Sequence, residues 1–134
     1  MEHACMASLG SENTQNLIAL CKSGLSAKIF DEVANCLQVP DIRLANIINI
    51  KKSTLIRRKR EGRLSFEESQ RLYRIVRLLN MAEKLFGSSE HARQWLNTSS
   101  RDFEGKSPLE YADNEIGARE VEAVLDRIGD GVIF

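Results

Sequence analysis

Apolar residues recur every three or four positions along most of the chain and seldom alternate with polar ones. This is the period of an α-helix, so the sequence predicts an all-α fold. Glycines, prolines and serines divide the pattern into separate helices, because these residues end helices or cap them. Both prolines, Pro40 and Pro108, stand where a helix could begin, a position that proline tolerates.

The pattern of the N-terminal residues predicts an arm followed by two helices. Residues 1–12 show no helical period and are expected to form a loose arm. A first helix is expected over residues 14–22, because Ser23 and Gly24 then stop the pattern. Ser26 is a good N-cap for a second helix, whose inner apolar stripe would consist of Ile29, Val33 and Leu37.

Residues 40–60 predict two short helices joined by a tight turn. Pro40 opens the first, which must end within residues 49–52, since Ser53 is a good N-cap for a second helix through Arg60. The apolar residues assigned to the first helix are Ile42, Leu44, Ala45, Ile47 and Ile48. A helix-turn-helix unit needs a small residue at the helix crossing, a turn residue that tolerates positive φ, and a buried apolar anchor. The sequence supplies them as Ala45, Asn49 and Leu55.

A long helix follows and is expected to connect two halves of the protein. Gly62 breaks the chain, and Ser65 with Glu68 forms the capping-box pattern of a helix that would run to about Phe86. One apolar stripe along it consists of Leu72, Ile75, Val76, Leu79, Ala82 and Phe86, and a second of Tyr73, Leu78 and Leu85. A helix that is apolar on two faces is expected to be central.

The segment after the long helix predicts two more helices with an irregular link between them. Ser88 caps the first, whose inward-facing residues are Ala92, Trp95 and Leu96. The link covers residues 97–106. Ser107 and Glu110 then form a second capping-box pattern, with Pro108 at the first helical position.

The last helix and an apolar tail complete the pattern. Asp113 or Asn114 would cap this helix, and its inner stripe would consist of Val121, Val124, Leu125 and Ile128. Gly129 and Gly131 end it before the tail, residues 132–134. We therefore divide the chain into an N-terminal arm with a first helix (1–25), a helix-turn-helix domain (26–64), a long connecting helix (65–86) and a small helical C-terminal domain (87–134).

Charge is unevenly distributed, although the formal net charge of the chain is zero. Residues 1–40 carry two basic and four acidic side chains, residues 41–80 carry eleven and four, and residues 81–134 carry six and eleven. A basic middle beside an acidic end indicates one surface for a polyanion and another for a different partner. The alternative is a solvated helical bundle whose charges happen to be sorted in this way.

The basic middle coincides with the second helix of the predicted hairpin. Such a helix can enter the major groove of DNA, where its first residues meet base edges and flanking cations meet phosphates. The residues that we expect to contact DNA are Lys52, Ser53, Thr54, Arg57, Arg58 and Arg60. A charged, solvated face is the alternative, but the run from Arg57 to Arg60 would repel itself without a counterion such as DNA phosphate. A further stripe could reach the DNA backbone or pair with the acidic C-terminal half: Arg71, Arg74 and Arg77.

Enzymatic, metal-binding and membrane functions find little support in the sequence. The three cysteines are widely spaced and the two histidines lack a further ligand at helical spacing, so neither a disulfide framework nor a zinc site is indicated. Residues 101–134 contain no phosphate-binding glycine loop, no paired catalytic carboxylates and no nucleophile elbow. The longest apolar stretch, residues 17–21, is too short for a membrane span or a signal peptide, which indicates a cytoplasmic protein. We expect no cofactor, no metal and no small-molecule substrate.

Beyond the helical pattern, the chain carries a series of short motifs in a characteristic order. They are Gly62-Arg63-Leu64-Ser65, Glu67-Glu68-Ser69, Arg71-Leu72, Phe86-Gly87, Trp95-Leu96, Lys106-Ser107-Pro108-Leu109, Gly117-Ala118 with Glu120-Val121, and the final Ile128 and Gly131. Their order and spacing resemble those of the Xre/MbcA/ParS antitoxins, and the likeness extends from about residue 26 to the end. The resemblance implies an Xre-type helix-turn-helix domain, a C-terminal toxin-binding domain, and a homodimer that represses its own operon through operator DNA.

The resemblance also implies a toxin partner, a RES-domain protein that consumes NAD. NAD would then be the substrate of the partner and not a ligand of this chain. The antitoxin would cover the active site of the toxin with its C-terminal part, here residues 119–134. The residues expected to contact the toxin are Arg119, Glu120, Glu122, Asp126, Ile133 and Phe134.

Other interpretations of the C-terminal half stay open at this point. The charges of the last helix are also compatible with a solvated face, and the tail with one that folds back onto the core. The chain would then be a stand-alone Xre-like regulator whose C-terminal half only dimerises. An enzyme is a third possibility, although acidic residues on helices are its only support in the sequence.

Overall fold

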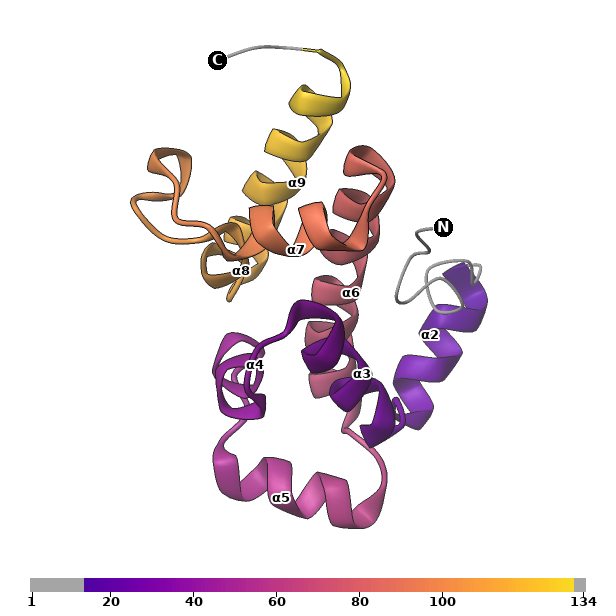
Figure 1. Cartoon of the computed structure of the whole chain (residues 1–134). Helices are drawn as coiled ribbons and strands as arrows, with labels where there is room; N and C mark the ends of the chain where they lie inside the picture. Colours follow the sequence, from indigo (N-terminus) through magenta and orange to yellow (C-terminus); the bar gives the residue numbers. More distant parts are fainter. Residues whose placement is uncertain (1–13, 132–134) are drawn as a thin grey trace.

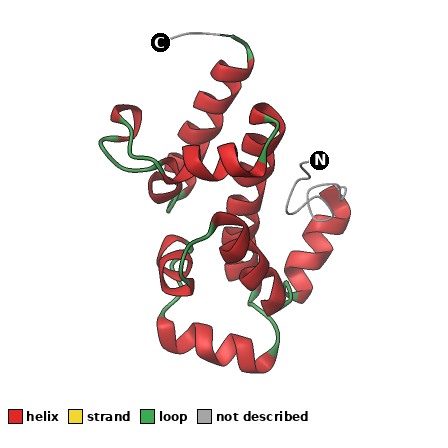
Figure 2. Cartoon of the chain, viewed as in Figure 1, coloured by secondary structure: helices red, strands yellow, loops and turns green. Residues whose placement is uncertain are grey.

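The computed structural model describes residues 14–131, and helices account for most of them (Figures 1 and 2). In chain order the helices are α2 (Thr14–Ser23), α3 (Ala27–Leu37), α4 (Asp41–Ile47), α5 (Lys52–Glu61), α6 (Phe66–Phe86), α7 (Ser89–Asn97), α8 (Pro108–Tyr111) and α9 (Glu115–Gly129). A short 3₁₀ turn, η1 (Arg101–Phe103), lies in the link between α7 and α8. Between residues 14 and 131 there is no β-strand, only an isolated bridge between Ser26 and Arg63. The prediction of an all-α fold is confirmed.

Side-chain caps begin most of these helices where the sequence predicts them. A serine or asparagine side chain accepts a hydrogen bond from a backbone N–H two or three residues further on at Ser26, Ser65, Ser88, Ser107 and Asn114. At Ser65 and Ser107 the glutamate three residues later completes a capping box. Of the two candidates for the cap of α9, Asn114 is the one used, and its Oδ1 accepts from the Gly117 N–H at 2.7 Å.

Three details of α4 and α5 differ from the prediction. Lys51, not Ser53, is the N-cap of α5, and Pro40 is the N-cap of α4 instead of its first residue. The expectation for Ser53 was wrong because the buried side chain of Ile50 fixes the chain just before Lys51, so the helix resumes before a capping side chain is reached. Ile42 was assigned to the apolar set of α4 but is 46% exposed.

Helix α6 forms the centre of the molecule. It packs against α2, α7 and α9, and Figure 1 shows it running from the hairpin of α4 and α5 toward the C-terminal helices. Its buried apolar residues are Leu72, Ile75, Val76, Leu78, Leu79 and Ala82. One hydrophobic core joins the residues of the hairpin to those of α7, α8 and α9, and α6 lies at its centre.

Helices α8 and α9 meet at Gly117, in the first turn of α9. A Cβ atom at this position would lie 1.8 Å from the carbonyl oxygen of Tyr111, so only glycine allows the two backbones to approach this closely. Helix α9 also packs against α6. These two contacts determine which side of α9 faces solvent.

Candidate functional sites

The hairpin of α4 and α5 has the geometry of a helix-turn-helix unit. Ala45, at the crossing, is fully buried, and Leu55 of α5 is 5% exposed. Asn49 has a φ of +59°, a left-handed conformation that asparagine adopts more readily than most residues. The N–H of Ile50 donates to the carbonyl oxygen of Ala45 at 2.8 Å and closes the turn. The three predicted framework positions are therefore confirmed.

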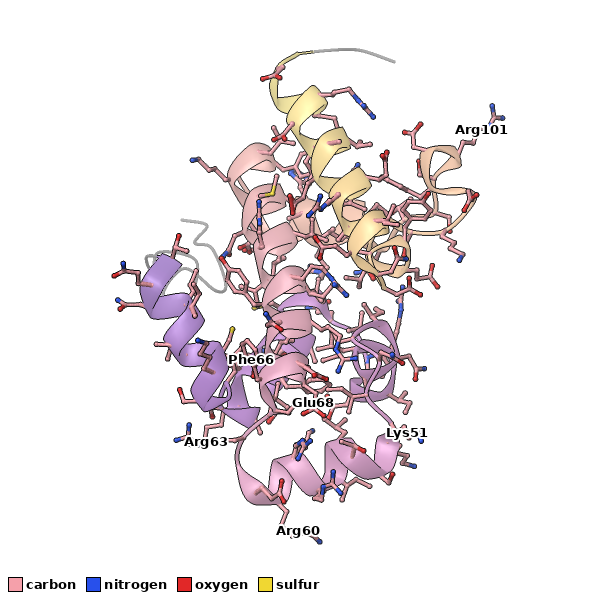
Figure 3. The ribbon with its side chains drawn as sticks, turned by 180° about the vertical axis from the view of Figure 1, so that it is seen from behind. Lys51, Arg60, Arg63, Phe66, Glu68 and Arg101 are labelled. Atoms are coloured by element: carbon pink, nitrogen blue, oxygen red, sulfur yellow. The ribbon has the colours of Figure 1, made fainter. Side chains whose placement is uncertain are left out.

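One side of α5 faces away from the rest of the protein. The exposed side chains there, which we call the α5 outer face, are Lys52, Ser53, Ile56, Arg57 and Arg60. They lie at i, i+1, i+4, i+5 and i+8, which is one face of a helix. Figure 3 shows Arg60 pointing away from the body of the molecule, and Lys51 before the first turn of α5. Thr54, also expected to contact DNA, is half-buried at the margin of this face.

Ile56 was not among the predicted contact residues. It is 56% exposed in the middle of the α5 outer face. Its exposure could have been predicted from its position directly after the buried anchor Leu55, because neighbouring residues of a helix point in different directions. An isoleucine there cannot belong to the same apolar stripe as the anchor.

Arg58 does not belong to the α5 outer face. Its Nε donates to Oε1 of Glu68 at 2.7 Å and its Nη2 donates to Oε2 at 3.2 Å, so a bidentate ion pair joins it to the first turn of α6. The side chains of Arg58 and Glu68 are 21% and 9% exposed, and Figure 3 shows Glu68 on the side of α6 near α5. The guanidinium of Arg58 is thus engaged within the protein, so we leave it out of the DNA contacts proposed below.

Glu68 has two hydrogen-bonded partners that hold it as a carboxylate. Burial alone would raise the pKa of this carboxyl. The hydrogen bonds from Arg58 and from the backbone N–H of Ser65 outweigh burial and lower the pKa below its ordinary value. The same carboxylate thus completes the cap of α6 and binds α5.

Lys59 is also held by carboxylates of the protein. Its Nζ lies 3.0 Å from Oδ1 of Asp31 in α3 and forms a second ion pair with Asp41 at the start of α4. It also lies 5.6 Å from the centroid of the Phe30 ring. The expectation that the run from Arg57 to Arg60 repels itself without DNA is therefore wrong for Arg58 and Lys59, whose counterions come from neighbouring helices.

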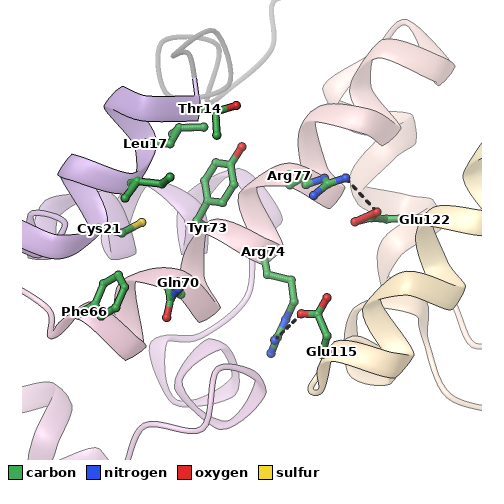
Figure 4. A pocket seen from close by; sticks show the side chains of 11 residues that line it. Thr14, Leu17, Cys21, Phe66, Gln70, Tyr73, Arg74, Arg77, Glu115 and Glu122 are labelled. Carbon is green, nitrogen blue, oxygen red and sulfur yellow. Dashed lines mark hydrogen bonds and ion pairs between the residues drawn. The ribbon is translucent and has the colours of Figure 1, made fainter.

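Two arginines of α6 face the C-terminal helix. Arg74 Nη1 lies 3.4 Å from Oε2 of Glu115, and Arg77 Nη2 lies 3.2 Å from Oε1 of Glu122 (Figure 4). Of the two roles considered for this stripe, pairing with the acidic C-terminal half is the one that the structure shows for both residues. Arg71 instead donates, at 3.5 Å, to a backbone carbonyl oxygen in the turn between α4 and α5.

Helix α9 turns a second charged side to solvent. We define this α9 outer face by four of its exposed residues: Ile116, Arg119, Glu120 and Asp126. Arg119 is 77% exposed in its side chain and its Nε donates to Oε1 of Glu115, one turn earlier, at 3.0 Å. Ile116 is 78% exposed and was not among the predicted contact residues. It could have been found as an apolar residue outside the inner stripe of the helix.

Glu122 lies next to Arg119 and Asp126 on α9, at the edge of the helix that faces α6. Its side chain is 19% exposed and pairs with Arg77, so we leave it out of the toxin contacts proposed below. Its carboxylate joins α9 to α6. Ile133 and Phe134 lie outside the described residues.

A cleft of about 430 Å³ lies between α2, α6 and α9 (Figure 4). Its apolar wall includes Leu17, Phe66 and Tyr73, and its charged residues are the two arginine–glutamate pairs that join α6 to α9. Burial raises the pKa of the Cys21 thiol in this wall, which disfavours a reactive thiolate. Within residues 14–131, no three His, Cys, Asp or Glu side chains are grouped to hold a metal ion, and no helix is long and apolar enough to cross a membrane.

These features define a class of protein: a helix-turn-helix unit with a cationic outer face, connected through one central helix to a second helical domain. Residues 17–77 match the family described as the antitoxin Xre-like helix-turn-helix domain. Residues 81–131 match the antitoxin Xre/MbcA/ParS C-terminal toxin-binding domain. The boundary between the two matches falls within α6.

Curated relatives agree with both matches. The chain is 30% identical to an antitoxin Xre of Yersinia enterocolitica over 118 residues, which cover 87% of this chain and 80% of the relative. It is 30% identical to an antitoxin Xre of Photorhabdus laumondii over 125 residues, with coverage of 92% and 84%. An antitoxin Xre of Pseudomonas putida is 33% identical over 73 residues, which cover 54% of this chain and 46% of the relative.

The chain belongs to the Xre/MbcA/ParS family of antitoxins. It combines a helix-turn-helix DNA-binding domain with a C-terminal toxin-binding domain, and the resemblance noted in its motifs is confirmed. As a member of this family it is a binding protein and not an enzyme.

Proposed function

We propose that this protein neutralises a RES-domain toxin by covering the active site of the toxin, and that it represses its own operon by binding operator DNA. The observation that carries the proposal is the presence of two separate exposed faces, one on α5 and one on α9, toward opposite ends of α6 (Figure 1). Because the two faces do not overlap, we propose that one molecule holds DNA and toxin at the same time.

On the DNA side, the α5 outer face provides the contacts. We assign base edges to Lys52 and Ser53, since the first residues of a recognition helix lie deepest in the major groove. Arg57 and Arg60 are assigned to phosphates, because both are exposed and lie further along the same face. Thr54 is a candidate at its margin. Arg58 has no place in this set and holds α5 in position.

On the toxin side, the α9 outer face provides the contacts. The exposed Ile116 would be an apolar anchor at the start of α9, and the charged residues that follow it, Arg119, Glu120 and Asp126, would set orientation and exclude wrong partners. The prediction that Ile133 and Phe134 fill an apolar part of the toxin site stays part of the proposal.

A RES-domain partner is supported by the motif series that begins at Gly62 and ends at Gly131. The toxin would bind and consume NAD, whereas the antitoxin needs no cofactor. We also propose a homodimer, because helix-turn-helix proteins commonly bind two half-sites related by a two-fold axis. We also propose a cytoplasmic location, because a protein that binds operator DNA must be in the same compartment as that DNA.

Co-expression with a RES-domain toxin encoded beside the gene of this protein would test the proposal. Growth and cellular NAD are measured with the wild-type antitoxin and with two paired variants. Arg57→Ala with Arg60→Ala is expected to preserve NAD but to release the operon from repression. Ile116→Asp with Glu120→Arg is expected to lose protection while repression continues, because the variant faces belong to different domains. A variant without residues 129–134 tests the contribution of the tail.

The outcomes separate the proposal from its main alternative. A stand-alone Xre-like regulator would repress its operon but leave NAD depleted, even with the wild-type chain. Such a result would overturn the assignment of α9 and the tail to a RES toxin, and would leave the DNA-binding role of α5 standing.

A further inference from the structure

The α5 outer face contains one side chain without charge or hydrogen-bonding capacity. Ile56 is 56% exposed there. Lys52 lies one turn before it and Arg60 one turn after it, so cations flank it along the helix axis. On the opposite side of α5, Leu55 packs in the core and Arg58 forms an ion pair with Glu68 of α6. Ile56 belongs neither to the hydrophobic core nor to the half-buried residues packed against it.

An exposed isoleucine among cations needs an apolar partner to be useful in a DNA interface. In the major groove, the C5 methyl group of thymine is the apolar feature that a base pair presents, whereas the other groups are hydrogen-bond donors and acceptors. Phosphates and guanine edges suit arginine and lysine, which the same face supplies at other positions. An isoleucine pressed against cytosine would leave the N4 amino group of that base without a partner.

We propose that Ile56 packs against a thymine methyl group in each operator half-site and makes the protein prefer thymine at that position. This inference rests on the proposed DNA-binding function of the α5 outer face. It adds a base-discriminating residue to a set that otherwise binds phosphate and polar base edges. Ile56 lies one turn into α5, within the segment of a recognition helix that approaches base edges.

Replacing thymine by deoxyuridine tests the proposal, because deoxyuridine pairs with adenine in the same way but lacks the methyl group. Duplexes that bind the full-length protein are selected from a random library, and each recurrent thymine is then replaced singly by deoxyuridine. Affinity is measured by fluorescence anisotropy at fixed salt. At one thymine per half-site, the loss of the methyl group is expected to weaken binding about fourfold, the effect of burying one methyl group.

Two variants show whether Ile56 is the residue that senses the methyl group. Ile56→Ala is expected to bind the thymine and deoxyuridine duplexes equally, because the contact is already lost. Ile42→Ala removes a similarly exposed isoleucine from α4 and is expected to keep the fourfold difference. Circular dichroism is used to check that both variants fold. Folding is expected because both isoleucine side chains are exposed.

The outcomes distinguish this inference from the function on which it rests. If the wild type binds selected duplexes but no deoxyuridine substitution weakens binding, the inference is overturned while DNA binding stands. The same conclusion follows if Ile56→Ala keeps the sensitivity. If no duplex is enriched at all, both the proposed operator binding and the thymine contact are wrong.

Discussion

Arg58 and Glu68 show how one ion pair can change the role expected of a residue. The guanidinium of Arg58 lies in a run of four cations and looks, in the sequence, like its neighbours. In the fold it meets the carboxylate that also caps α6, at 2.7 Å. The capping box could be predicted because its two members are three residues apart. The ion pair could not, because it joins residues of different helices whose relative orientation depends on the core.

We predict that Glu68→Gln destabilises the protein by about 1–2 kcal/mol near neutral pH, because a hydrogen-bonded charge pair is lost while glutamine can still complete the cap. The pKa of Glu68 lies below its ordinary value of 4.5. Its stabilising contribution is therefore complete above about pH 4.5 and is lost as the pH falls through the lowered pKa. Urea denaturation of the wild type and the variant from neutral to acidic pH measures the difference.

Glu67→Gln is the matched control for this experiment, since Glu67 is the exposed neighbour in the same first turn. The difference in unfolding free energy between the wild type and Glu68→Gln should shrink as the pH falls below about 4. A difference that stays constant through this range would show that Glu68 stabilises the protein without its charge.

At the scale of helices, local signals determined most element boundaries. The caps at Ser26, Ser65 and Ser107 were predictable because each depends on residues within three positions of the helix start. The start of α5 was not, because it depends on the burial of Ile50 and not on a capping side chain. The exposed sides of α5 and α9 could be predicted only in part, since ion pairs with other helices withdraw Arg58 and Glu122 from solvent.

The junction of α8 and α9 gives an element-scale prediction. Gly117→Ala would place a methyl group 1.8 Å from the carbonyl oxygen of Tyr111, so α8 and α9 must separate. We expect a loss of about 3 kcal/mol in unfolding free energy, at the upper end of the range for overpacking, and weaker toxin binding. Thermal and urea denaturation measure the first effect, and co-purification with the toxin measures the second.

Gly129→Ala is a control at the other end of the same helix. A Cβ atom there would lie 3.4 Å from Cδ1 of Leu85, which is ordinary contact with a flexible side chain. The free energy of unfolding of Gly129→Ala should differ from that of the wild type by less than about 0.5 kcal/mol, because the higher helix propensity of alanine offsets the contact with Leu85. Equal losses for the two variants would contradict the close approach of α8 and α9.

At the scale of the whole molecule, the segregated charges serve two purposes: some join the two halves of the protein and others face solvent. The sequence indicated a basic middle and an acidic end with separate partners. Part of each charge is used to join the two halves, through Arg74 with Glu115 and Arg77 with Glu122. Other charged side chains, which are not used in ion pairs between helices, face solvent on α5 and α9. The net charges of segments predicted that two surfaces exist, but the tertiary ion pairs decide which residues form them.

The two exposed faces should differ in their affinity for DNA, because the α5 outer face is expected to bind phosphates and the α9 outer face is not. The most direct test is the salt dependence of binding to the DNA upstream of the protein's own reading frame. Each phosphate contact contributes about 0.9 to the slope of log affinity against log salt concentration. Arg57→Ala should therefore lower the slope by about 0.9 for each protomer bound, and Arg119→Ala, on α9, should leave it unchanged. An unchanged slope in Arg57→Ala, or a reduced slope in Arg119→Ala, would contradict the account.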